Sequence, residues 1–318
     1  MKNESNKMRN KVQKVTIKKD FSGQRLDNFL INYLKGVPKS KIYSIIRKGE
    51  VRVNSSRKQV FYKIKENDLI RIPPLQIASK EEIKAPFEFI DVLKRSIIFE
   101  DDDCLVLNKP FGIASHGGSG ISIGLIEAIR NFGPRYRDCK LVHRLDKNTS
   151  GCQLVSKNQS FLRKCNNLIR EKKIIKKYIA LVHGNWPENL NLIENKLTKN
   201  IGVSGERLVK VSSDGKNSIT KFKLLEKNNF FSKLSCNLVT GRTHQIRVHT
   251  SHSNFPIVGD NKYGDRVKDK KFLHQDLKRM YLHSESLEIE ELNLKVFCNE
   301  PKEFKKLIKI SESKSFLS

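Results

Sequence analysis

The chain has 318 residues, 37% of them apolar and 30% charged, a composition that is typical of globular proteins and excludes fibrous and wholly disordered chains. Its six cysteines lack the two-residue spacing of a zinc knuckle, no leader segment is evident, and no apolar run approaches the roughly 18 residues that cross a bilayer, so we expect a cytoplasmic protein with reduced thiols. The formal net charge of +28 at pH 7 attracts polyanions, which makes nucleic acid the first partner to consider.

The N-terminal quarter predicts a small folded module behind a basic arm. Residues 1–14 are polar and basic without periodicity, so we expect them to be disordered. Residues 15–75 combine helical and alternating apolar spacing. We expect two helices and a small sheet, with helices at 26–34 and 42–46 and strands at 15–17, 51–54 and 68–72.

Positive charge is concentrated in this quarter. Residues 1–85 hold 21 Lys and Arg against 8 Asp and Glu. A codon bias toward A and T explains part of the lysine count but not the clustering, and any single charge is equally consistent with solvated surface. The whole set on so small a unit favours a phosphate-contacting face. The expected RNA contacts are Arg25, Lys39, Lys41, Arg47, Lys48 and Arg52.

A linker and a larger second domain follow. Pro73-Pro74 opens an extended segment that we expect to form a linker over residues 76–94. Residues 95–318 contain more strand patterns than helix patterns and no regular strand-helix alternation, which favours a mixed, mainly antiparallel α+β domain over a parallel sheet. We expect strands at 97–100, 104–108, 176–184, 218–225, 232–239 and 286–289 and an amphipathic helix at 161–169.

The most informative segment is residues 141–151, with the sequence LVHRLDKNTSG. Its apolar approach and polar turn place a single carboxylate, Asp146, at the end of a strand, where it is available as a nucleophile or base. His143 and Arg144 flank it and can tune its charge. The alternative interpretation is a capped turn with a surface carboxylate, which describes most isolated aspartates.

Two other segments offer site residues. Tyr178 stands in the 176–184 strand beside two lysines, so it could stack on a base while Lys177 contacts a phosphate; the alternative is an ordinary strand aromatic. Residues 240–249, TGRTHQIRVH, would in an extended conformation direct Thr243, Gln245, Arg247 and His249 to one face. A buried arginine there needs an anionic partner.

A metal site was the alternative for this last segment. His244, His249 and His252 are close in sequence, but their spacing matches no zinc pattern and Arg247 would oppose a bound cation. We therefore expect no metal.

Several of these segments together resemble the active-site motifs of RNA pseudouridine synthases of the large-subunit ribosomal, RluA-like family. The matching segments are NKPFG at 108–112, HRLD with TSG at 143–151, KKY at 176–178, GRTHQIRVH at 241–249, and 256–265. Residues 15–75 resemble a small RNA-binding module named after a ribosomal small-subunit protein, through RLD at 25–27 and GEVRVN at 49–54. HGGSG at 116–120 and SGER at 204–207 are similar to a subgroup whose members act on several uridines of 23S rRNA.

The resemblance implies a pseudouridine synthase fold, an isomerase activity and a set of roles. Asp146 would be the catalytic carboxylate, either attacking the anomeric carbon of the sugar or removing the adjacent sugar proton; both routes stay open. Arg247 would pair with Asp146 and keep it ionised. Tyr178 would stack on the uracil and help to remove the proton on C5, and Arg144 would hold the backbone of the flipped nucleotide or fill its place in the stack. His143, Lys177 and Arg242 would also contact RNA.

The same resemblance implies neither metal nor cofactor, and it implies 23S rRNA or a large-subunit assembly precursor as the partner. We also expect no membrane contact, and a monomer. One departure concerns Cys152-Gln153, which stands where the family usually carries aliphatic residues. We expect looser packing behind Asp146 there.

Two other functions compete with this interpretation. An RNA or nucleoside glycosylase also cleaves an N-glycosidic bond with a carboxylate, but it releases free uracil, whereas a synthase retains the base. A non-catalytic RNA-binding or ribosome-assembly protein would need the basic module alone. The presence of Asp146, Tyr178 and Arg247 together argues against that second alternative.

Overall fold

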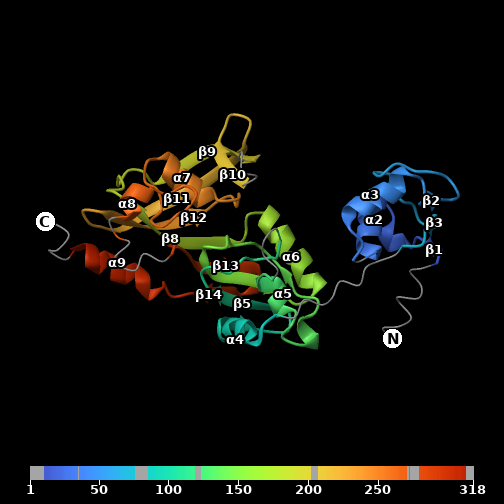
Figure 1. Cartoon of the computed structure of the whole chain (residues 1–318), viewed down its shortest axis with the longest axis horizontal. Helices are drawn as coiled ribbons and strands as arrows, with labels where there is room; N and C mark the ends of the chain where they lie inside the picture. The colour runs from blue at the N-terminus through green and yellow to red at the C-terminus, as the bar shows by residue number, and fades with distance from the viewer. Residues whose placement is uncertain are drawn as a thin grey trace. The chain divides into compact units, whose positions relative to one another are not determined.

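The structure is a computed structural model that describes residues 11–34, 36–75, 85–118, 123–201, 207–270, 272 and 279–312. The chain forms two compact units, residues 1–83 and residues 84–318. Each unit has a core of its own, and Figure 1 shows the helices and strands of both.

The first unit packs two helices on a three-stranded antiparallel sheet of order β1-β3-β2. Its elements are β1 (Gln13–Thr16), η1 (Lys19–Phe21), α2 (Leu26–Tyr33), α3 (Lys39–Arg47), β2 (Arg52–Val53) and β3 (Leu69–Ile72). Leu30 of α2, Ile42 and Ile45 of α3 and Ile70 of β3 are fully buried in one core. The helices and strands expected from the sequence are confirmed, although β1 begins two residues inside the segment that we expected to be a disordered arm.

The second unit is built on a sheet that has 11 strands among the described residues, nine of them in the order β10-β9-β11-β12-β8-β13-β7-β5-β4, with β14 beside β13 and β6 beside β7. All pairs are antiparallel except β13 with β7. The expected mixed, mainly antiparallel α+β fold is confirmed. The strands are β4 (Ile97–Glu100), β5 (Cys104–Lys109), β6 (Lys140–Leu141), β7 (Ser150–Ser156), β8 (Ile175–His183), β9 (Leu192–Ile201), β10 (Arg207–Val211), β11 (Lys216–Lys227), β12 (Phe231–Leu238), β13 (Leu282–Ile289) and β14 (Leu294–Phe297).

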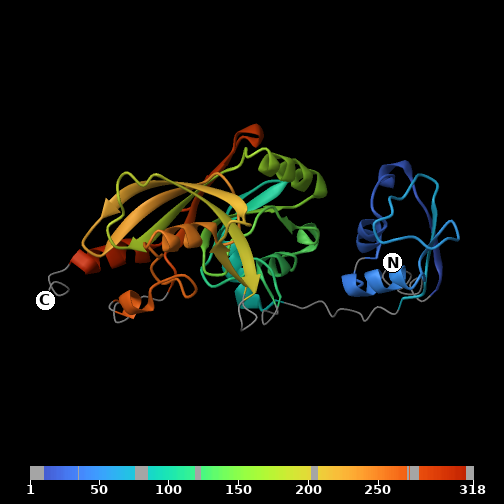
Figure 2. The same ribbon diagram turned by 90° about the horizontal axis from the view of Figure 1, so that it is seen from above.

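Helices cover this sheet at both ends (Figures 1 and 2). They are α4 (Phe87–Arg95), α5 (Leu125–Ile129), α6 (Gln159–Arg170), α7 (Gln245–His252), α8 (Arg266–Lys270) and α9 (Lys302–Glu312), with short 3-10 turns η2 (Pro134–Tyr136) and η4 (Glu290–Leu292). Because side chains alternate along a strand, β5 gives Leu105 to the core under α4 and α5 and Val106 to the core under α6. In the same way β8 gives Tyr178 to the core that contains Ile246 of α7, and Ile179 to the core that contains α9.

Two expected elements were wrong. Residues 87–94, assigned to the linker, belong to helix α4, whose Leu93 is fully buried beside α5. Pro86 stands just before the first turn, where proline is tolerated, so it marked a helix start and not an extended segment. Residues 240–249 were expected to be extended, but residues 245–252 form helix α7, so Gln245, Arg247 and His249 do not share one face of a strand.

The physical reason for the helix lies in Gln245. Its side-chain Oε1 accepts hydrogen bonds from the Arg242 backbone N–H at 3.0 Å and the Thr240 hydroxyl at 2.8 Å, which fixes the turn that starts α7. Polar and apolar residues alternate over 245–249. This pattern is also compatible with a helix that is buried on most sides, and six of the eight residues of α7 are buried.

Candidate active site

Asp146 lies in the loop between β6 and β7, and the backbone on both sides of it is held by buried polar side chains. On the N-terminal side, Leu145 donates its N–H to Gln153 Oε1 at 3.2 Å and accepts from the Ser115 hydroxyl at 2.6 Å. On the C-terminal side, the Lys109 ammonium donates to the Lys147 carbonyl at 3.2 Å. The carboxylate is therefore carried by a backbone that is fixed before any substrate binds.

The looser packing that we expected at Cys152-Gln153 is not found, because Gln153 is buried and hydrogen-bonded. Its side chain is fully buried, and besides its bond to Leu145 its Nε2 donates to the His143 carbonyl at 2.8 Å. Cys152 is buried in the core that contains Leu154. The polar residue that departs from the family pattern thus adds hydrogen bonds to the Asp146 loop.

Lys109 is the second buried support of the loop, a role that its place in the NKPFG motif did not predict. It is fully buried, and its ammonium also donates to the carbonyls of Pro110 at 3.0 Å and Ile113 at 2.8 Å. Burial lowers the pKa of Lys109 to about 7, although the charge of Asp146 acts in the opposite direction.

The segment after Asp146 shapes the turn into β7. Gly151 has a φ of +108°, and a Cβ there would lie 2.1 Å from the Ser284 carbonyl oxygen, so only glycine fits. The Ser150 hydroxyl lies 2.8 Å from His283 Nδ1 and accepts from Arg279 Nη2 at 2.5 Å. These contacts tie the turn to β13, the parallel neighbour of β7.

The Asp146 carboxylate pairs with Arg247, as the resemblance implied. Arg247 Nη1 donates to Asp146 Oδ2 at 2.8 Å, with the arginine side chain 6% exposed and the aspartate 28% exposed. The Nε and Nη2 groups of Arg247 donate to the two carboxylate oxygens of Asp260, each at 2.7 Å. Burial alone would lower the pKa of Arg247, but the hydrogen bonds and charge of Asp260 raise it above its ordinary value.

Asp260 was not found from the sequence. It is 1% exposed and also accepts from the backbone N–H groups of Lys262 at 2.9 Å and Tyr263 at 3.2 Å. The available signal was the buried-arginine argument itself, because a guanidinium with three donor groups in a core needs more than one acceptor. Asp260 fixes the planar guanidinium so that its remaining edge faces Asp146.

Tyr178 reaches the same site from β8. The register of the sheet places Gly151 opposite Ser284 and Ser284 opposite Tyr178, so the tyrosine lies two strands from the turn that follows Asp146. Tyr178 is 6% exposed, and its core includes Leu145. Burial raises the pKa of Tyr178 and the charge of Asp146 raises it further, so the hydroxyl keeps its proton at neutral pH. The three expected residues, Asp146, Tyr178 and Arg247, therefore converge.

The expected RNA contacts near this site separate into two groups. Arg144 and Arg242 are exposed, the latter with Nε 3.3 Å from the Asn217 carbonyl. His143 instead faces inward, because its Nε2 accepts the Leu154 N–H at 3.2 Å and its Nδ1 is buried, which does not support the RNA contact that we expected.

Lys177 is exposed on the face of β8 opposite Tyr178, whereas Lys176 shares the face of Tyr178. The Lys176 ammonium lies 3.6 Å from the position that a Cβ on Gly241 would take. Burial lowers the pKa of Lys176. The lysine beside the site is therefore Lys176, although the sequence interpretation named Lys177.

In the first unit, five of the expected contacts are exposed: Lys39, Lys41, Arg47, Lys48 and Arg52. Arg25 differs from them because its guanidinium binds both carboxylate oxygens of Asp27, at 2.8 and 3.1 Å, and its side chain is half exposed. The 204–206 part of SGER and residues 119–120 of HGGSG lie outside the described residues.

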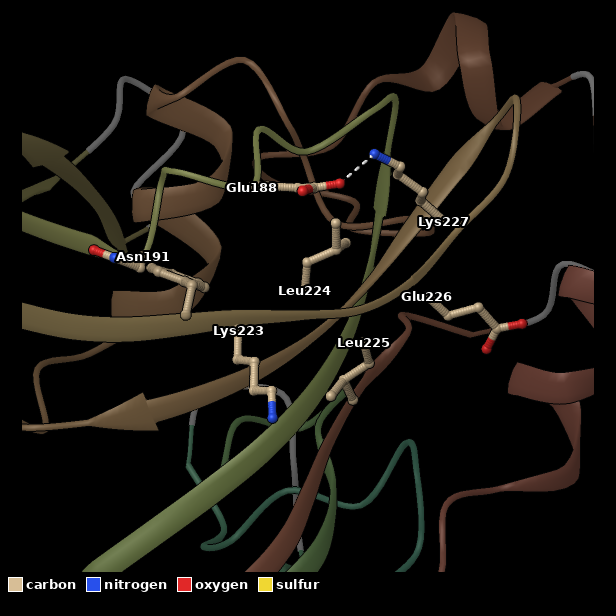
Figure 3. Close-up of a pocket in the computed structure, with 8 residues that line it drawn as sticks. Glu188, Asn191, Lys223, Leu224, Leu225, Glu226 and Lys227 are labelled. Atoms are coloured by element: carbon tan, nitrogen blue, oxygen red, sulfur yellow. Dashed lines mark hydrogen bonds and ion pairs between the residues drawn. The ribbon is translucent and has the colours of Figure 1, made fainter.

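A shallow hollow of about 460 Å³ lies beside β11, where Glu188 pairs with Lys227 at 2.8 Å close to Leu224 (Figure 3). No residue of the Asp146 cluster lines it. Within the described ranges, no three metal-ligating side chains come together, and no helix is long and apolar enough to span a bilayer.

Comparisons with known proteins show the family of the chain. The model of the RNA pseudouridylate synthase family matches residues 103–252, and that of the S4 domain matches residues 24–70. The chain is 49% identical to ribosomal large subunit pseudouridine synthase C of Yersinia pestis, over 89% of both chains. It is 48% identical to the protein of that name from Escherichia coli strain K12, over 87% of this chain and 88% of that one.

The chain belongs to the RNA pseudouridylate synthase family. It is an isomerase with an S4-type module at its N-terminus, as the sequence motifs implied. Among solved structures, human RNA pseudouridylate synthase domain containing 1 aligns with a TM-score of 0.54 at 26% identity, covering 65% of this chain and 83% of that one. Human RNA pseudouridylate synthase domain containing 4 shares the fold with a TM-score of 0.58 over 70% of this chain and 95% of that one.

Proposed function

We propose that this synthase isomerises several specific uridines of 23S rRNA to pseudouridine, with Asp146 as its catalytic carboxylate. The observation that supports the assignment most strongly is the 2.8 Å ion pair between Asp146 and an arginine that Asp260 holds in place. The curated relatives of similar length are named for the ribosomal large subunit, which supports the choice of substrate.

The reaction keeps every atom of the uridine. In one route Asp146 attacks C1′ as the C1′–N1 bond breaks, and the carboxylate leaves again when C5 of the rotated uracil bonds to C1′. In the other route Asp146 removes the C2′ proton, the same N1 bond breaks, and the proton returns when C5 attacks. In both, C5 loses a proton and N1 gains one, so no electron carrier is required and we expect no cofactor.

Arg247 and Tyr178 complete the proposed catalytic group. Arg247 favours the ionised form of Asp146, which both routes need at their first step. Tyr178 is protonated at neutral pH, so in the resting enzyme it serves as a stacking surface for the uracil and not as a base. Arg144, exposed beside the loop, would take the place of the flipped nucleotide or hold its backbone.

RNA would be held by cations on both units. The exposed lysines and arginines of the S4-type module contact phosphates and supply affinity that depends on salt. Beside the site we assign a phosphate contact to Lys176 because its ammonium is partly desolvated on the face of Tyr178. We expect the enzyme to act as a monomer in the cytoplasm, on 23S rRNA or its assembly precursor.

Unmodified 23S rRNA transcript tests this function directly. Incubation with the purified enzyme, followed by pseudouridine mapping along the transcript and measurement of free uracil, should show a few modified uridines and no released base. A 16S rRNA transcript serves as the control and should stay unmodified. Stoichiometric release of uracil would instead identify a glycosylase, and binding without either product would identify a non-catalytic RNA-binding protein.

A further inference from the structure

A second polar pair, His244 with Tyr263, lies against the Asp146 carboxylate. His244 is the residue before α7 and has a left-handed backbone with a φ of +55°. Its Nδ1 lies 2.7 Å from the Tyr263 hydroxyl, and its Nε2 lies 3.7 Å from Asp146 Oδ2. Tyr263 also places its ring 5.0 Å from the Arg247 guanidinium. It therefore contacts both side chains that face Asp146.

The hydrogen bonds around Tyr263 determine which nitrogen of His244 carries the proton. The Tyr263 oxygen accepts the Val209 backbone N–H at 2.9 Å, so its own proton is available to His244 Nδ1. A neutral ring that accepts at Nδ1 carries its proton at Nε2, and that N–H faces the carboxylate. The other tautomer would direct the Nε2 lone pair at Asp146 and leave the Tyr263 proton without an acceptor among the described contacts.

The charge of His244 follows from the groups that surround it. Burial lowers the pKa of His244, Arg247 and Lys262 lower it further, and Asp146 and Asp260 act in the opposite direction. The net lowering keeps the imidazole neutral at pH 7. A neutral imidazole offers Asp146 an N–H donor without adding a second cation to the ion pair with Arg247.

We propose that His244 is a positioning residue whose Nε2–H binds Asp146 Oδ2 in the RNA complex, with its tautomer set by Tyr263. The present separation of 3.7 Å is longer than a hydrogen bond, and such bonds often shorten only when the substrate is bound. Arg247 and His244 would then both hold Oδ2 and direct Oδ1 toward the ribose. The proposal rests on the catalytic role proposed for Asp146.

Two substitutions at one position separate donor function from packing. In His244→Gln the amide nitrogen can occupy the place of Nε2, whereas in His244→Asn it can reach only the place of Nδ1, and asparagine also suits the left-handed backbone. We expect His244→Gln to keep kcat within about threefold of wild type and His244→Asn to lower kcat by roughly tenfold or more with little change in KM. Tyr263→Phe should lower kcat by roughly threefold to tenfold. Melting temperatures identify variants that are simply unstable.

Nitrogen-15 NMR of the free enzyme tests the tautomer without RNA and therefore independently of the proposed function. The His244 signals, assigned by comparison with His244→Gln, should show a protonated Nε2 and an unprotonated Nδ1, and Tyr263→Phe should mix the two tautomers. A protonated Nδ1 in the wild type would overturn the proposal. So would a wild-type kcat in His244→Asn, or equal losses in the Gln and Asn variants.

Discussion

The Asp146 loop and the S4-type module both present charged residues, but they hold them in opposite ways. In the loop, buried partners hold three groups beside the carboxylate: Asp260 holds the Arg247 guanidinium, Gln153 the Leu145 N–H, and Lys109 the Lys147 carbonyl. In the module, Lys39, Lys41, Arg47, Lys48 and Arg52 are exposed to water. The first arrangement suits chemistry, which needs fixed distances, and the second suits RNA binding, which needs adaptable charge.

This difference predicts how each region responds to substitution. Removal of one buried partner leaves a charge or a backbone group unpaired in a core, so stability and kcat change together and by large factors. Removal of one exposed lysine changes affinity by a small factor that salt can mask. The four predictions that follow test this contrast.

Among the residues that support the carboxylate, the largest effect is expected at Asp260, which holds Arg247 without facing the substrate. Asp260→Asn leaves the buried guanidinium with only one carboxylate partner. We expect a loss of about 3 kcal/mol in the free energy of unfolding and a fall in kcat of roughly 100-fold. Urea denaturation and single-turnover kinetics measure both. Asp214→Asn, the same change at an exposed turn, should alter neither the free energy of unfolding nor kcat. A wild-type kcat in Asp260→Asn would contradict the role of Asp260 in holding Arg247.

Two buried histidines, His249 and His283, predict that the second unit loses stability in acid. Burial lowers the pKa of His249 and of His283 to about 4, against about 6.5 in the unfolded chain. Both are neutral in the folded state, so their contribution to stability is complete above pH 6.5 and is lost as the pH falls toward 4. We expect the free energy of unfolding to drop by several kcal/mol over that window.

His249 provides a matched test of this pH dependence. Neither of its ring nitrogens has a hydrogen-bond partner among the described residues. His249→Leu should therefore flatten the pH dependence and be more stable than wild type by about 1–2 kcal/mol at pH 5. Urea denaturation of both proteins at pH 7 and pH 5 measures the free energy of unfolding at each pH. An unchanged slope between those pH values would show that His249 is not the titrating group.

A substitution at Gln153 tests whether hydrogen bonds to the backbone of the Asp146 loop affect kcat. Gln153→Leu removes the donor to the His143 carbonyl and one of two acceptors of the Leu145 N–H, which keeps the Ser115 hydroxyl at 3.2 Å. We expect a loss of about 2 kcal/mol in stability and a fall in kcat of roughly tenfold. The neighbouring substitution Cys152→Val keeps the core apolar and should change kcat by less than about twofold. If the two variants had the same kcat, Gln153 would have no role in supporting the site.

The smallest expected effect is a difference in RNA affinity between variants of two adjacent lysines, Lys176 and Lys177. Lys176→Met should weaken binding of a 23S rRNA fragment by a factor of about 3 to 10 and reduce the slope of log affinity against log salt by roughly 0.7 to 0.9. Lys177→Met, which removes the same charge from the opposite face of β8, should leave affinity and slope unchanged. Binding titrations at several salt concentrations decide between the two residues.

Much of the site was predictable because its residues lie in short, distinctive segments. The turn at residues 146–151 and the strand that carries Tyr178 follow from local patterns of polar and apolar residues. The partner of Arg247 could be inferred as an anion from its burial alone. The period of a strand would also have placed Lys176, and not Lys177, on the face of Tyr178.

The features of the fold and the site that were not predicted depend on contacts that no local sequence pattern encodes. Residues 245–252 form a helix because the Gln245 side chain accepts the Arg242 N–H and holds the turn that precedes the helix, although the same alternation of polar and apolar residues fits a strand. Asp260 follows Arg247 by 13 residues and reaches it through a folded-back loop. The parallel pairing of β13 with β7 joins segments more than 130 residues apart, and it is this pairing that makes Gly151 obligatory.

The most direct test of the central claim is single-turnover pseudouridine formation by Asp146→Asn on a 23S rRNA transcript, measured beside RNA affinity. Asparagine keeps the size of the side chain but cannot act as the nucleophile or base. We predict a rate at least about 1,000-fold below wild type, with the dissociation constant for the transcript within about threefold. A variant that forms pseudouridine at the wild-type rate would contradict the assignment of Asp146.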